Sequence, residues 1–161
     1  MEIVLNLHVK NYNGGPLIKI YNNDKTLFED SLMVAGPHIV RINTDMSLPN
    51  KLVIEHQGKN MKKDTCMDSA GTIIDDKGFT IDSVKLNDVL LENELYHFPF
   101  IKENGEPIKN NNYIGFNGKF VINIDKDNLY AWHKGWQRML ATDIESNFSY
   151  EEFRKEIFSN D

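Results

Sequence analysis

Two segments of alternating apolar and polar residues flank a polar, carboxylate-bearing loop between residues 51 and 91. The first segment covers 51–56 and the second covers 79–86. Such alternation is typical of half-buried β-strands, because successive side chains of a strand point to opposite faces. The apolar positions change parity between Ile81 and Val84, which predicts a β-bulge near Asp82 and Ser83. An antiparallel β-sheet is therefore the first expectation for this chain.

Similar short segments, separated by Gly, Pro and Asn, occur along most of the sequence. We expect further strands at 3–9, 17–21, 26–32, 38–43, 113–116 and 119–124. Asn117 and Gly118 stand between the last two segments, and this dipeptide favours a type I′ hairpin turn. At least eight short strands predict a mainly β fold, an antiparallel β-sandwich or jelly roll. The expected core residues of the facing sheets are Ile3, Leu5, Leu7, Leu52, Ile54, Phe79, Ile81, Phe120 and Ile122.

The sequence changes character after residue 127, where apolar residues recur at helical spacing. A capping box at Ser149 and Glu152 predicts a further short helix. We therefore expect a β-sandwich domain over 1–127 and an aromatic, helical extension over 128–161, packed either on that domain or on a partner. Residue types favoured at protein interfaces occur in this extension. The candidate interface residues are Trp132, Trp136, Arg138, Met139, Phe153 and Phe158.

Composition narrows the possible functions. A net charge of −6 argues against a nucleic-acid partner, which needs clustered basic residues. Lys59, with Lys62 and Lys63, is the one basic cluster, and we interpret it as a solvated loop. Neither a signal peptide nor a membrane-spanning segment is expected, nor is a disulfide, since Cys66 is the only cysteine. No familiar catalytic motif occurs either, so we expect no enzymatic activity.

Two kinds of binding site remain open. Clustered carboxylates suit calcium, which takes several oxygen ligands, although the same residues also suit solvated turns. The candidate calcium ligands are Asp64, Asp68, Asp75 and Asp76. Aromatic rings and amides suit carbohydrate, and an irregular segment at 94–112 predicts a long surface loop that could carry them. The candidate carbohydrate residues are Tyr96, Phe98, Asn111 and Tyr113.

Four segments of the sequence together resemble a known type of protein module. They cover residues 52–59, 64–65, 76–88 and 130–132. They resemble the β-sandwich modules of carbohydrate-binding type that also occur as accessory proteins of tailed-phage particles. This resemblance favours a non-enzymatic structural or attachment protein, a bacteriophage virion component such as a capsid decoration, fibre or tail accessory. Its partners would be other virion proteins or further copies of itself, and it would be made in the host cytoplasm. The alternative is a carbohydrate-binding module for surface glycans, with no cofactor or with calcium.

Overall fold

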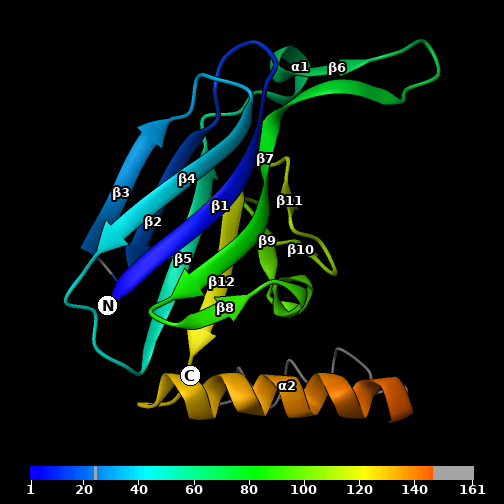
Figure 1. The fold of residues 1–161 in the computed structure, drawn as a ribbon. Helices are drawn as coiled ribbons and strands as arrows, with labels where there is room; N and C mark the ends of the chain where they lie inside the picture. Colours follow the sequence, from blue (N-terminus) through cyan, green and yellow to red (C-terminus); the bar gives the residue numbers. More distant parts are fainter. Residues whose placement is uncertain (24, 147–161) are drawn as a thin grey trace.

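The computed structural model describes residues 1–23 and 25–146, with side chains as far as residue 142. Two antiparallel sheets pack face to face in this part of the chain (Figure 1). The first sheet has the strand order β11-β7-β1-β4, and β6 and β8 also pair with β7. Its strands are β1 (Glu2–Asn11), β4 (Gly36–Asn43), β6 (Thr65–Met67), β7 (Ile73–Leu86), β8 (Val89–Leu91) and β11 (Tyr113–Ile114).

The second sheet has the order β10-β9-β12-β5-β2-β3. Its strands are β2 (Leu17–Asn22), β3 (Lys25–Ser31), β5 (Asn50–Gln57), β9 (Phe100–Lys102), β10 (Pro107–Ile108) and β12 (Gly118–Ile124). Three helical segments complete the described chain: α1 (Met61–Asp64), the 3-10 helix η1 (Asn93–His97) and α2 (Leu129–Ser146). The architecture is thus a β-sandwich with a C-terminal helix, and the predicted fold class is confirmed.

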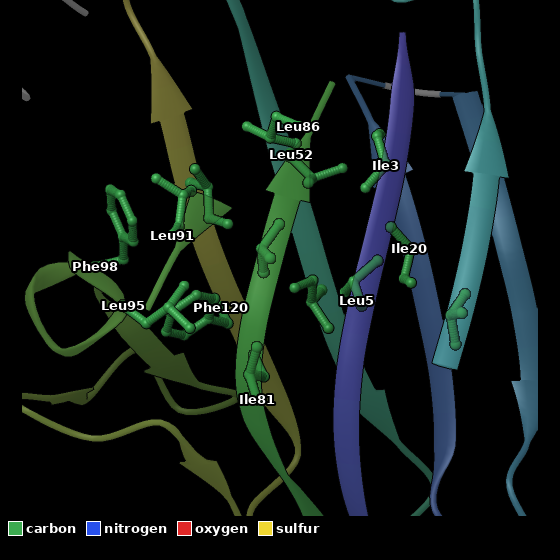
Figure 2. Close-up of a cluster of buried hydrophobic side chains, with 14 of the residues drawn as sticks. Ile3, Leu5, Ile20, Leu52, Ile81, Leu86, Leu91, Leu95, Phe98 and Phe120 are labelled. Carbon is green, nitrogen blue, oxygen red and sulfur yellow. The ribbon is translucent and has the colours of Figure 1, made fainter. Parts of the chain in front are cut away.

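The core lies between the two sheets, where apolar side chains from both sheets point toward one another (Figure 2). All nine predicted core residues are buried, with Leu7 the most exposed of them at 1%. Burial alternates along the strands because each second side chain points outward. Phe79, Phe100 and Phe120 are among the largest fully buried side chains.

The predicted bulge is present in β7. Asn6 of β1 pairs with Ser83, whereas the next residue, Leu7, pairs with Ile81. Asp82 is therefore the extra residue, and it restores burial of the apolar positions on both sides of the bulge. At its other end β7 continues beyond the sandwich and pairs with β6, and this hairpin projects from the body of the molecule (Figure 1).

The hairpin predicted at Asn117 and Gly118 is wrong. The strand before it, β11, pairs with β7 in the first sheet, whereas β12 pairs with β5 and β9 in the second. Gly118 serves close packing instead, because a Cβ there would collide with the carbonyl oxygen of Ile101. The Asn-Gly dipeptide thus lies where the chain crosses between sheets.

The segment 94–112 is more ordered than expected. It contains η1, β9 and β10, and it contributes Leu95, Phe98 and Phe100 to the core. Helix α2 lies across one end of the sandwich (Figure 1). In the described part of the chain, no helix is both long and apolar enough to span a membrane.

Candidate functional site

A lysine buried between the two sheets organises the end of the sandwich opposite α2. Lys59 follows β5 and Gly58, and its side chain is fully buried. The ammonium group donates hydrogen bonds to the Asp76 carboxylate of β7 and to the carbonyl oxygen of Gly115. It was interpreted from the sequence as part of a solvated basic loop, and that interpretation is wrong for Lys59. The one available signal was its position directly after a strand and a glycine.

Asp76 is the acceptor at the centre of this arrangement. Thr65 Oγ1 donates to Asp76 Oδ1 at 2.8 Å, and the Tyr113 hydroxyl donates to Oδ2 at 2.5 Å. We call Lys59, Thr65, Asp76 and Tyr113 the buried polar cluster. Thr65, Asp76 and Tyr113 come from three strands of the first sheet, and Lys59 comes from the loop that follows β5 of the second sheet. The cluster therefore fixes that loop relative to the first sheet.

Burial and hydrogen bonding set the protonation of the buried polar cluster. Burial lowers the pKa of Lys59, and the neighbouring Asp76 opposes that change. Burial also works to raise the pKa of Asp76, but hydrogen bonds from Lys59, Tyr113 and Thr65 outweigh it and hold the pKa below its usual value. Burial and the Asp76 carboxylate raise the pKa of Tyr113. The tyrosine therefore stays protonated and donates to an ionised aspartate.

A second buried aspartate is neutralised in the same way nearby. Asp64 Oδ2 lies 3.1 Å from Lys77 Nζ and accepts from the Asn60 amide at 2.7 Å. Asp64 Oδ1 accepts from Asn13 Nδ2 at 2.8 Å. These hydrogen bonds, with the Lys77 charge, overcome the burial that would raise the pKa of Asp64 and hold it low. Each buried carboxylate at this end of the sandwich therefore has its own lysine.

The backbone of Lys59 connects this cluster to the surface. Its N–H donates to Asn117 Oδ1 at 2.9 Å, and its carbonyl oxygen accepts from Asn117 Nδ2 at 2.9 Å. Asn117 in turn accepts a hydrogen bond from the Glu103 amide through its own carbonyl oxygen, at 2.9 Å. The loop before α1, the loop before β12 and the turn after β9 are thereby held together.

A groove opens beside these loops on the outer face of the second sheet, across β9, β12 and β5. Its volume is about 560 Å³, and we call it the β5–β12 groove. Glu55 and Gln57 point into it because they alternate with the buried Ile54 and His56. Its polar lining is Glu55, Gln57, Lys102, Glu103, Asn117 and Lys119, and its apolar lining includes Ile101 and Val121.

A smaller hollow of about 320 Å³ adjoins this groove and shares Lys102, Glu103 and Asn117 with it. Phe116 lines the hollow, and the Lys102 ammonium lies 4.6 Å from the centre of its ring. Lys102 also pairs with Glu106 at 2.8 Å. Along the floor of the groove, Lys119 stands opposite Glu55 in the strand register. Charges of both signs therefore line the surface and largely compensate one another.

The predicted carbohydrate residues do not form one surface. Tyr96 is exposed on η1, whereas Phe98 is buried and stacks on Trp132 with the ring centres 6.1 Å apart. The Asn111 side chain hydrogen-bonds the backbone of Tyr113, and the Tyr113 hydroxyl belongs to the buried polar cluster. Of these four residues, only Tyr96 presents an exposed ring.

The predicted calcium ligands are separated in the same way. Asp64 and Asp76 are paired with lysines, as described above. Asp68 accepts from the amides of Ala70 and Thr72 in its own turn, and Asp75 accepts from the Asp76 amide. Within the described residues, no three metal-ligating side chains of His, Cys, Asp or Glu come together. The arrangement therefore does not fit a calcium ion bound by these four residues.

The aromatic residues of α2 lie in the chain's own core. Trp132 and Trp136 are 2% and 6% exposed, and both pack on Phe98. Arg138 is exposed and Met139 is half-buried. Phe153 and Phe158, together with the helix predicted after Ser149, lie outside the described residues. Trp132 and Trp136 thus contact the sandwich itself, the first of the two alternatives considered for the extension.

Comparison with known proteins gives a likeness of fold. No family model matches the sequence, and no curated protein matches it. A solved structure of the module vCBM60 in complex with galactobiose matches with a TM-score of 0.53 and 13% identity, over 76% of this chain and 98% of that one. The selenomethionine form of vCBM60 matches with a TM-score of 0.52 and 11% identity, over 76% of this chain and 89% of that one.

That second structure was described in work linking two families of calcium-dependent carbohydrate-binding modules. At such low identity the likeness establishes the fold alone. The fold is similar to that of these two solved modules. This agrees with the part of the sequence resemblance that concerned the fold, whereas neither match links the chain to a virus particle.

Proposed function

We propose that the chain is a non-catalytic carbohydrate-binding module that takes a short, neutral oligosaccharide in the β5–β12 groove. The observation that carries this proposal is an open groove, lined by polar and apolar side chains, on the sheet of a fold whose solved neighbours are carbohydrate-binding modules. A groove on a rigid sheet is suited to an extended ligand, because its lining is held in place by strand pairing.

The chemistry of the lining supports a sugar ligand. Glu55 and Glu103 offer acceptors, Lys119 offers donors, and Gln57 offers both. Sugar hydroxyls both donate and accept hydrogen bonds, so such a mixture suits them. Ile101 and Val121 provide apolar contact for the C–H faces of a ring. Because the acidic and basic groups are balanced, the groove favours a neutral sugar over an acidic one.

Titration calorimetry on the full chain tests this proposal, with galactobiose as the first ligand and an array of neutral and acidic glycans as the screen. The double variant Glu55→Ala, Gln57→Ala should lose binding, because both side chains are surface groups of the groove. Tyr96→Ala is the matched control and should bind like the unmodified chain, since Tyr96 lies on η1, apart from the groove-lining residues.

Loss of binding in Tyr96→Ala alone would place the site at η1 and refute the groove. Absence of binding to any glycan on the array would refute the function. An incubation of the bound sugar with the chain should leave it uncleaved, as expected of a module without catalysis. A role as a virion component, and localisation there, remains a sequence-based prediction that neither the fold nor the comparisons test.

A further inference from the structure

The oxygen atoms around Lys59 are of the kind that calcium binds. Within reach of one another are a carboxylate from Asp76, the backbone carbonyl of Gly115 and the hydroxyl of Thr65. Calcium takes six to eight such oxygen ligands, commonly carboxylates and backbone carbonyls. In this chain, however, the position among these oxygens is filled by the Lys59 ammonium, which donates to both Asp76 and Gly115.

From this we infer that the ammonium groups of Lys59 and Lys77 take the place of a bound calcium ion by neutralising the buried carboxylates. The chain therefore folds and forms its groove without metal. The two lysines face two buried aspartates, Asp76 and Asp64, and the four charges cancel. A buried carboxylate needs such a partner, since an unpaired buried charge is strongly destabilising.

A calcium ion could not simply join this arrangement. It would add two positive charges beside the buried Lys59 ammonium and the partly buried Lys77 ammonium, and like charges repel strongly away from water. The carboxylate oxygens are also occupied, because Asp76 accepts from Lys59, Thr65 and Tyr113. Asp64 accepts from Lys77, Asn13 and Asn60. The lysines and a metal are therefore alternatives.

The replacement of calcium by Lys59 also affects the β5–β12 groove, a consequence that rests on the proposed function. The Lys59 backbone pairs with both polar atoms of the Asn117 side chain, and Asn117 lines the groove. A lysine anchored on Asp76 thus holds a wall of the groove in place. Glycan binding should accordingly be as independent of calcium as folding is.

The first experiment compares the full chain in excess EDTA and in excess calcium chloride, by thermal unfolding and by galactobiose titration. A ligand that binds only the folded state raises the melting temperature. We expect the same melting temperature and the same affinity in both buffers. A melting temperature lowered by several degrees in EDTA would overturn the inference. If no glycan binds in either buffer, the proposed function fails, whereas the melting temperatures still decide the role of the lysines.

The second experiment removes the ammonium groups. Lys59→Met should lower the melting temperature in EDTA and regain part of it in calcium chloride, because the Asp76 and Gly115 oxygens that accept from Lys59 then face no cation. Lys62→Met, on the exposed side of α1, is the control and should respond to neither buffer. A folded Lys59→Met that is indifferent to calcium would overturn the inference.

Should Lys59→Met be unfolded in EDTA, recovery of its circular dichroism on adding calcium is the supporting result. If it is unfolded in both buffers, Lys77→Met is measured in the same way, since the Lys77 side chain is 13% exposed and its loss is milder. Indifference of that variant to calcium would count against the inference as well.

Discussion

Removal of the Trp132 side chain should destabilise the whole domain, because this residue joins α2 to the sandwich. The ring is 2% exposed, stacks on Phe98 at an interplanar angle of 8°, and meets Trp136 edge-on. Its indole N–H donates to the Asn123 carbonyl of β12 at 3.1 Å. Truncation of a buried Trp to Ala typically costs about 3–5 kcal/mol. Of a total stability of roughly 5–15 kcal/mol, that is a large share.

Urea unfolding followed by circular dichroism measures this loss for Trp132→Ala. Trp132→Phe should lose less, about 1–2 kcal/mol, because it removes the hydrogen bond but keeps most of the aromatic contact. Tyr130→Ala on the same helix is the control: its ring is 59% exposed, so the change should stay within about 0.5 kcal/mol. If Trp132→Ala were as stable as the control, and light scattering showed a smaller assembly, the helix would belong to a partner instead.

Three further predictions concern single residues. His56 is fully buried, and burial, helped by the nearby Lys59, lowers its pKa from 6.5 to about 4. Below pH 6.5 the unfolded state binds a proton at His56 that the folded state does not bind, so the free energy of unfolding should fall by ~3 kcal/mol between pH 6.5 and about 4. The free energy of unfolding of His56→Leu should depend less on pH in that window, and an unchanged slope would contradict this cause. Tyr113→Phe should cost about 1–3 kcal/mol in urea unfolding, because the Asp76 carboxylate loses a buried donor, and a cost near zero would show that the hydroxyl is dispensable. Gly118→Ala should lower the melting temperature markedly, since its Cβ meets backbone; a neutral result would mean that β9 and β12 can separate at little cost.

The sequence predicted the sandwich well because strand alternation reports burial directly. Each strand carries its own pattern, so Leu52 and Ile54 identify an inward face without knowledge of their neighbours. The bulge at Asp82 was visible for the same reason, as a break in that pattern. Strand pairing is harder to predict from the sequence, because it depends on the path of the chain between the strands. Asn117 and Gly118 have the composition of a hairpin, yet the chain crosses there to the other sheet.

The candidate site could not be predicted to the same extent. Lys59 occurs in a run of lysines and carboxylates, and charged residues in such a run are usually solvated. Its burial depends on Asp76, which lies 17 residues away along the chain, and on a carbonyl 56 residues away. The β5–β12 groove likewise combines residues from three strands. The local sequence pattern does not predict contacts between residues that lie so far apart along the chain.

Because of the bulge in β7, the effect of inserting or deleting a residue in this strand depends on where the change falls. Deletion of Asp82 would remove the extra residue and leave the apolar side chains on both sides facing the core, because Ser83 would then follow Ile81 directly, as their partners Asn6 and Leu7 follow one another in β1. Deletion of Thr80 would instead turn Phe79 or Ile81 away from the core, because the alternation of the strand has a period of two residues. The tips of loops impose no such rule of parity. In this fold, therefore, insertions and deletions can accumulate at the ends of the sandwich, whereas between Phe79 and Leu86 a residue can be lost without turning apolar side chains outward only at the bulge.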